Sequence, residues 1–237
     1  GPQKNAISDF FSALNTENLS SKMVRMWLVG FSRAAALRDV INPTSEDEWS
    51  GAAGTPPDYT HGSGYASYDK NANIIVGSIA SPEKMSDLGI GRFDCGAFFA
   101  GTNITLESPP SGAYINSYSG ANTMFQIKQD GVPDGTAVRF ANNIRVDSTS
   151  ARPNGVFVGS RNGNNVSLTR VYGGRGTQTV TAIRGGGVTS KNPIYLWGEN
   201  TEGNFSTVGI TSGLNTAEVE TLGGLLYDLC VGVGHTD

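Results

Sequence analysis

The sequence predicts a single all-β domain, a sandwich or barrel of antiparallel strands with helices at its two ends. Short runs rich in β-branched and aromatic residues recur roughly every ten residues, each bounded by turn residues, which is typical of such folds. Glycine accounts for 32 of the 237 residues, about twice its usual share, whereas charged residues make up only 16%. A chain of this length can also bury a large core without a disulfide or a metal ion.

The expected strands are the runs at residues 73–79, 95–106, 112–118, 122–129, 136–146, 155–161, 165–172, 178–184 and 193–199. Asn-Gly and Gly-Gly sequences at residues 162–165 and 173–176 tolerate the positive φ of tight turns, so residues 155–184 are predicted to form a three-strand antiparallel meander. Val166 and Leu168 alternate with polar residues, which predicts a sheet with one buried face.

The N-terminal segment combines helical spacing with a break. Phe10, Phe11 and Leu14 lie at helical intervals, and Ser8 can cap a short helix that precedes the polar residues 15–18. Apolar residues resume at 23–27, so two short helices, or a helix and a strand, are expected to open the chain.

A longer helix is expected at the C-terminal end. Asn215 is a suitable N-cap with Glu218 three residues later, the pattern of a capping box. An apolar stripe then follows at helical spacing, at residues 219, 222, 226, 229 and 233. Gly223 and Gly224 each weaken a helix by about 1 kcal/mol relative to Ala, so we expect close approach to a sheet there.

Charge and cysteine content exclude some classes of protein. The net charge of −4 argues against general nucleic-acid binding, and no run approaches the ~18 apolar residues of a membrane span, so neither partner is expected. Cys95 and Cys230 could pair, but we favour reduced and buried thiols because Cys230 falls on the apolar stripe.

The N-terminal residues suggest how the chain divides into a terminal segment and a domain. Gly1 and Pro2 match the remnant of a cleaved tag. We therefore expect residues 1–17 to comprise that remnant and a helical segment, and residues 18–237 to form the β domain.

Three stretches carry a family resemblance. They are "LSSKMVRMWLVG" at residues 19–30, "HGSGYASYDKNAN" at 61–73 and "PIYLWGENTEGNFSTVGITSGLNTAEVETLGGLLYDLCVGVG" at 193–234. Together they resemble the concanavalin A-like, laminin G-like jelly-roll modules found in bacteriophage structural proteins. The resemblance covers most of residues 18–234 and implies a two-sheet antiparallel jelly-roll sandwich that presents loops on a virion tail or appendage. Modules of this kind are often suspected of glycan binding, and the fold also hosts glycan lyases and hydrolases.

Catalytic patterns are weak in this sequence. Glu46 and Glu48 could form an acid pair on an extended segment, but Pro, Ser and Gly surround them, which favours a solvated loop. His61 and His235 have no nucleophile elbow to accompany them. We therefore expect no enzymatic activity, with a lyase or hydrolase as the second alternative.

No cofactor is expected. Asp130 and Asp134 flank a turn and are the one candidate calcium site, but two carboxylates fall short of the six to eight oxygens that calcium takes. An ordinary Pro-Asp-Gly turn is the favoured interpretation, and calcium is the alternative.

Aromatic residues near turns are candidates for sugar binding, because the apolar faces of sugars stack on rings. The proposed ligand-binding residues are Tyr114, Tyr118, Tyr65, His61 and Arg175. A wider set of aromatic candidates comprises Trp49, Tyr59, Tyr68, Tyr172 and Trp197.

The leading hypothesis is a non-enzymatic virion structural protein that binds a host surface glycan. The first alternative is a scaffold or decoration protein that docks to other virion subunits, for which Phe10 and Phe11 are suitable contacts. The expected partners are a surface polysaccharide or virion subunits, the expected location is the virion surface, and a homo-oligomer is possible.

Overall fold

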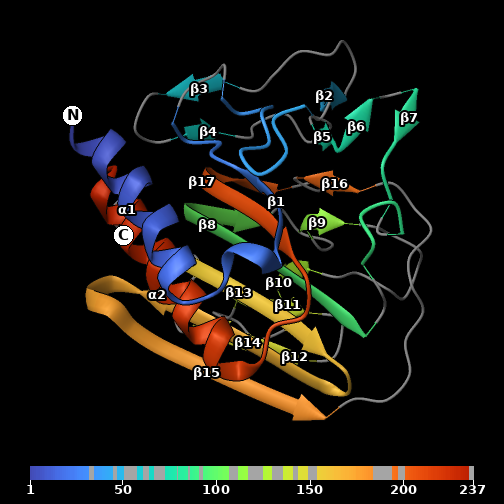
Figure 1. Ribbon diagram of the computed structural model, residues 1–237, viewed down its shortest axis with the longest axis vertical. Helices are drawn as coiled ribbons and strands as arrows, with labels where there is room; N and C mark the ends of the chain where they lie inside the picture. Colours follow the sequence, from blue (N-terminus) through green and yellow to red (C-terminus); the bar gives the residue numbers. More distant parts are fainter. Residues whose placement is uncertain are drawn as a thin grey trace.

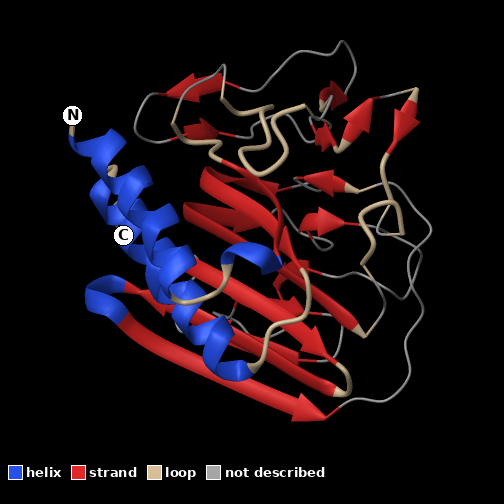
Figure 2. Cartoon of the chain, in the orientation of Figure 1, coloured by secondary structure: helices blue, strands red, loops and turns tan. Residues whose placement is uncertain are grey.

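The computed structural model describes residues 1–31, 35–44, 47–50, 58–60, 64–66, 73–78, 80–84, 86–90, 93–106, 112–116, 125–129, 136–140, 144–148, 154–183, 194–196 and 201–234. Two antiparallel sheets pack face to face, and two helices cover the outer face of the larger sheet (Figures 1 and 2). This three-layer arrangement confirms the predicted β-sandwich with helical ends.

The larger sheet has the strand order β15-β14-β13-β8-β17-β4-β3, and β1 pairs with β17 off this path. Its strands are β1 (Met23–Trp27), β3 (Asp58–Thr60), β4 (Gly64–Ala66), β8 (Asp94–Leu106), β13 (Gly155–Asn162), β14 (Asn165–Tyr172), β15 (Gly176–Ile183) and β17 (Thr201–Thr211). Strand β17, next to the middle strand β8, pairs with three strands: β8, β4 and β1.

The second sheet has the order β12-β11-β10-β9-β16-β5-β2. Its strands are β2 (Glu48–Ser50), β5 (Asn73–Ile75), β9 (Gly112–Asn116), β10 (Phe125–Gln129), β11 (Thr136–Phe140), β12 (Ile144–Ser148) and β16 (Tyr195–Leu196). A small hairpin joins β6 (Gly77–Ser78) to β7 (Ser81–Pro82). Each predicted run therefore contains strand, although residues 136–146 hold two antiparallel strands rather than one.

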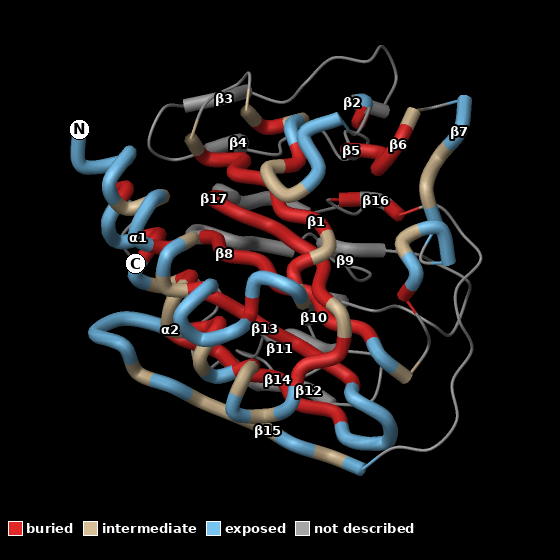
Figure 3. Tube along the Cα trace, viewed as in Figure 1, coloured by how far each residue is buried: buried red, intermediate tan, exposed pale blue. Residues whose placement is uncertain are grey.

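One hydrophobic core lies between the two sheets. Phe99 and Phe157 stack with ring centroids 4.8 Å apart, and Ile74 and Leu196 of the second sheet belong to the same buried cluster. A second core lies between the other face of the large sheet and the helices, where Phe98 meets residues of α2 (Thr216–Gly232) and α1 (Pro2–Thr16). Figure 3 shows the buried strands of the large sheet behind these helices.

Cys95 and Cys230 are both reduced and buried, as predicted. Cys95 belongs to the core between the sheets, whereas Cys230 belongs to the core under the helices, so a layer of sheet separates the two thiols. Burial raises the pKa of the Cys95 thiol to about 12. The thiol is therefore protonated and unreactive at neutral pH.

The predicted meander is confirmed by β13, β14 and β15, which pair in continuous antiparallel register. Gly163 and Gly174 adopt the positive φ expected at its two turns. The prediction of one buried face was wrong for β14, because Ser167 and Thr169 are buried as well. The hydroxyl groups of Ser167 and Thr216 hydrogen-bond at 2.7 Å, since α2 covers that face.

The C-terminal helix α2 begins as predicted. Asn215 and Glu218 form the capping box, and all the predicted stripe residues are buried. Glu218 also forms a 2.7 Å ion pair with Lys22. Burial raises the pKa of Glu218, but hydrogen bonds from Lys22 and from the Asn215 backbone outweigh it, so the pKa lies below its usual value.

The N-terminal helix differs from the prediction. It runs from Pro2 to Thr16, so Ser8 is an interior residue rather than a cap, and the helix begins with proline in its first turn, where no backbone donor is needed. Its end at the polar segment was predicted correctly. Phe10 is buried and makes an edge-to-face contact with Phe11 at 5.4 Å, and the partly buried Phe11 packs against the same core.

The two glycines of α2 provide a matched test of helix packing. A Cβ on Gly223 would lie 3.1 Å from Val171 Cγ2 of the sheet, whereas a Cβ on Gly224 would meet Arg175 Nη2 at an ordinary 3.7 Å. We expect Gly224→Ala to raise the free energy of unfolding by up to about 1 kcal/mol through helix propensity. Gly223→Ala should raise the free energy of unfolding by less, or should lower it, because α2 must move off the sheet to make room for the Cβ. Urea unfolding of both variants checks this; an equal gain at both positions would contradict the close approach at Gly223.

Candidate functional site

The predicted binding residues fall in different parts of the chain. His61, Tyr118, Asp130 and Asp134 lie outside the described residues. Tyr114 lies on β9 of the second sheet, whereas Tyr65 lies on β4 of the large sheet. There Tyr65 is paired with Tyr59 on one side and with Phe205 on the other.

The other candidates are distributed similarly. Of the acid pair, Glu48 lies exposed on β2, and Glu46 is outside the described residues together with Tyr68, Trp197 and His235. Arg175 is at the tip of the β14–β15 hairpin. It is therefore the predicted site residue whose surroundings the structure shows most fully.

The hairpin tip is fastened to helix α2 by two polar contacts. Arg175 forms an ion pair with Asp228, and the backbone N–H of Gly174 donates a hydrogen bond to the hydroxyl of Tyr227 at 3.1 Å. Arg175 has a φ of 61°, which is uncommon for a residue with a side chain. The tight turn imposes this conformation, and it leaves the guanidinium group exposed beside α2.

Tyr172 stands next to this turn with 38% of its surface exposed. The guanidinium carbon of Arg170 lies 4.6 Å from the centroid of the Tyr172 ring, a cation–π distance. The Arg170 side chain is itself anchored, because its Nε and Nη2 atoms donate hydrogen bonds to the carbonyl oxygen of Asn154 at 3.1 and 2.8 Å. The ring is therefore held in place while much of it remains open to solvent.

The β14–β15 turn therefore carries two groups of side chains, which together we call the Tyr172 patch: the Tyr172 ring on the face of β14 that holds Arg170, and Gly174, Arg175, Tyr227 and Asp228 on the side of α2. It offers an aromatic ring on one side of the turn, and a phenol hydroxyl, a cation and a carboxylate on the other side. The sequence pointed to Arg175 and, in the wider set, to Tyr172. It did not point to Tyr227 and Asp228, which lie on α2 outside the apolar stripe and meet the hairpin through contacts 53 residues apart in sequence.

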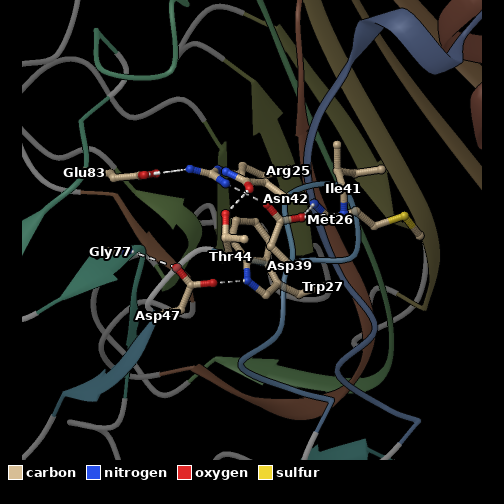
Figure 4. A network of polar contacts seen from close by, with 10 residues as sticks. All are labelled: Arg25, Met26, Trp27, Asp39, Ile41, Asn42, Thr44, Asp47, Gly77 and Glu83. Carbon is tan, nitrogen blue, oxygen red and sulfur yellow. Dashed lines mark hydrogen bonds and ion pairs between the residues drawn. The ribbon is translucent and has the colours of Figure 1, made fainter.

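A second polar cluster is buried near the start of the large sheet (Figure 4). Arg25 is only 5% exposed, and its Nη1 atom donates a 2.9 Å hydrogen bond to the carboxylate of Asp39. Its Nη2 atom contacts both carboxylate oxygens of Glu83 at 2.6 and 2.8 Å. Burial lowers the pKa of Arg25, but the bonds to Asp39 and Glu83 outweigh it and raise the pKa above its usual value.

The same cluster holds two backbone segments together. Asp39 accepts hydrogen bonds from the backbone N–H groups of Met26 and Ile41 at 3.0 and 2.9 Å. Asp47 accepts one from the indole of Trp27 at 2.6 Å and another from the backbone of Gly77 at 3.0 Å. Each carboxylate is therefore engaged in fixing β1 to neighbouring loops, which is a structural rather than an acid–base role.

The described residues also bear on metal binding and on membrane insertion. Among the described residues, no group of three or more His, Cys, Asp or Glu side chains is placed to hold a metal ion. In the same part of the chain, neither helix has the length and apolarity needed to cross a membrane. The candidate calcium ligands Asp130 and Asp134 lie outside that part.

Comparisons with known proteins address the fold. No protein-family model and no curated protein sequence matches the chain. The chain is similar to a solved structure of a mutant Trypanosoma rangeli sialidase displaying trans-sialidase activity, with 12% identity and a TM-score of 0.52. That likeness covers 98% of this chain and 39% of the sialidase, so the chain spans well under half of that protein.

Two further structures are binding domains. The chain is similar to the binding domain of botulinum neurotoxin serotype D/C VPI 5993, with 11% identity, a TM-score of 0.47 and coverage of 87% of this chain and 53% of that one. It is also similar to the binding domain of botulinum neurotoxin DC in complex with SialylT, with 13% identity, a TM-score of 0.48 and coverage of 87% and 52%. At such low identity, the likeness to the sialidase structure shows a shared β-sandwich fold alone.

Proposed function

We propose that this protein is a non-enzymatic carbohydrate-binding module and that the Tyr172 patch is a contact surface for the sugar. The observation that carries the proposal is the partly exposed Tyr172 ring, which Arg170 holds next to the turn that carries the exposed pair of Arg175 and Asp228 on its α2 side. Sugars present apolar C–H faces that stack on aromatic rings, and hydroxyl groups that bond to charged side chains. The patch offers both kinds of contact on a rigid hairpin.

The non-enzymatic part of the proposal has its own support. Asp39, Asp47 and Glu83 are engaged by Arg25, Trp27 or backbone N–H groups. These three carboxylates therefore serve to fix Arg25, Trp27 and neighbouring backbone, which is a structural role. A lyase or hydrolase of the same fold is the alternative that would use other residues.

We also propose a setting for the module, namely the tail or an appendage of a bacteriophage particle. The support is the resemblance of residues 19–30, 61–73 and 193–234 to concanavalin A-like modules of phage structural proteins. In that setting the ligand is a polysaccharide on the host surface. A scaffold or decoration protein that docks to other virion subunits is the alternative function.

A glycan array tests the proposal, using bacterial capsule and lipopolysaccharide sugars with and without calcium. We expect a reproducible hit that Tyr172→Ala weakens by about tenfold, the effect of losing roughly 1.4 kcal/mol of stacking. Arg175→Gly should also weaken binding, and glycine suits the positive φ at that position. Thermal unfolding of each variant checks that the fold is retained.

Three further variants locate the site. Ile183→Ala removes an exposed apolar side chain at the other end of β15 and should leave binding unchanged. Loss of binding in Tyr114→Ala or Tyr118→Ala, but not in Tyr172→Ala, would move the site to these two residues. A blank array in both conditions would contradict the carbohydrate-binding proposal, and released reducing ends would favour the enzyme.

A further inference from the structure

Strand β15 forms one edge of the large sheet. It pairs with β14 along its whole length, from Gly176 to Ile183, and with no other strand of the described chain. Figure 1 shows it as the outermost strand at the lower rim, and in Figure 3 its residues are exposed or partly exposed. In an antiparallel edge strand, alternate residues direct their N–H and C=O groups away from the sheet, where another strand can bind them.

This edge lacks the features that usually prevent such pairing. Natural edge strands are commonly protected by charged residues, by proline or by a β-bulge. The sequence of β15, "GTQTVTAI", contains no charge and no proline, and its register with β14 has no shift. Ile183 is 80% exposed, which is the largest exposed fraction among the large hydrophobic residues of the described chain.

We propose that β15 pairs with β15 of a second copy of this chain, antiparallel about a two-fold axis at Val180. In an antiparallel ladder, two residues that lie opposite each other either both direct their N–H and C=O groups toward the partner strand or both direct them away. In a symmetric pair of identical strands, the two-fold axis must therefore pass between two copies of the same residue. An axis at Val180 pairs every residue from 177 to 183. An axis at Thr179 pairs the same number of residues, 176 to 182, but places Ile183 opposite Arg175 in the turn, whereas axes farther from the middle of β15 shorten the ladder.

The side chains of this register fit one another. Thr177 lies opposite Ile183 and Thr179 lies opposite Thr181, so one face consists of β-branched pairs, and on the other face Val180 lies opposite itself between two pairs of Gln178 with Ala182. A second copy is favoured over an unrelated peptide because this uncharged segment is complementary to itself. The chain carries a net charge of −4, yet the paired edges bring no like charges together.

The pairing joins two large sheets into one continuous sheet. A ladder of seven residues from each copy is smaller than the roughly 20–30 residues per partner of a stable interface. We therefore expect a reversible dimer whose population rises with protein concentration. Its formation should shield Ile183 and the outward N–H groups of β15 from water.

Sedimentation velocity and hydrogen exchange of the full chain test the proposal together. We expect a dimer at near-millimolar concentration and slower exchange of the amides in residues 176–183 than at low concentration. Thr181→Lys and Ile183→Lys place charge on exposed edge positions and should abolish both effects. Val231→Lys is the matched control, because Val231 is a 45% exposed β-branched residue on α2, away from the edge.

Three outcomes would overturn the proposal. The first is a monomer at every concentration. The second is a dimer that survives both edge variants, which would place the interface elsewhere. The third is protection of the β15 amides that does not depend on concentration, which would mean that the edge is covered within a single chain.

Discussion

Asp39→Ala is expected to lower the free energy of unfolding by about 3–5 kcal/mol, the usual cost of removing one partner of a buried ion pair. Asp39 is fully buried, and its carboxylate bonds to Arg25 and to the backbone N–H groups of Met26 and Ile41. The substitution leaves two backbone donors without an acceptor. It also leaves the Arg25 guanidinium group with Glu83 as its one ion-pair partner. The Nε atom of Arg25 already lacks a hydrogen-bond partner, so the buried guanidinium group would lose further polar contacts.

Urea unfolding followed by circular dichroism measures this loss. Asp39→Asn should cost less than Asp39→Ala, because an amide oxygen can still accept hydrogen bonds from the two backbone groups. Asp228→Ala is the matched control, since it breaks an ion pair whose two side chains are more than half exposed, and such pairs contribute about 1 kcal/mol or less. Equal effects of Asp39→Ala and Asp228→Ala would show that the buried network does not stabilise the fold.

The parts of the fold that could be predicted are those with local signals. The meander over β13 to β15 was predictable because its turns contain glycines at positions of positive φ. Helix α2 was predictable because its capping box and apolar stripe are both contained in one short segment. These features depend on residues close in sequence, so a single sequence suffices to identify them.

Strand β17 was not among the strands predicted from the sequence, and the reason is physical. Its residues from Ser206 to Thr211 are all buried, because one face meets the other sheet and the opposite face meets the helices. A strand buried on both faces shows no alternation of polar and apolar residues. The polar Ser206 and Thr207 then resemble loop residues, although their hydroxyls bond to the carbonyl oxygens of Ala100 and Trp27.

Strand β1 could not be distinguished from a helix because of a bulge. Met23 and Met26 both face the helices, whereas Trp27 faces the core between the sheets. Two residues three positions apart share a face of a helix but not of a regular strand. The register shift between Met23 and Arg25 produces this spacing within a strand.

In the candidate site, too, local features could be predicted and contacts between distant segments could not. Arg175 was predictable as a residue at an exposed hairpin tip, whereas its contact with Asp228 joins segments 53 residues apart. The buried cluster around Arg25 likewise joins β1 to residues 39 and 83, which occupy loops without a regular pattern. Pairings of this kind depend on the topology of the sandwich, which local periodicity does not encode.

Gly209→Ala is expected to destabilise the protein by about 3 kcal/mol or more, through overpacking in the second core. Gly209 lies on β17 between Met26 of β1 and Phe98 of β8. A Cβ at this position would overlap the ring of Phe98 and would lie 2.7 Å from the carbonyl oxygen of Arg25. Phe98 is fully buried, and the carbonyl belongs to a paired strand, so neither group can move aside at low cost.

Urea unfolding of Gly209→Ala, with Gly224→Ala as the control at a glycine that has room for a Cβ, measures the effect. If the variant does not fold, Gly209→Ala combined with Phe98→Leu provides the test, because the smaller side chain removes one of the two overlaps. A double variant that folds where Gly209→Ala alone does not would show that the two residues are in contact; if both single variants fold, the double variant should be more stable than the sum of the two single changes predicts. Wild-type stability in Gly209→Ala, or additive behaviour in the double variant, would contradict the close approach of β17 to Phe98.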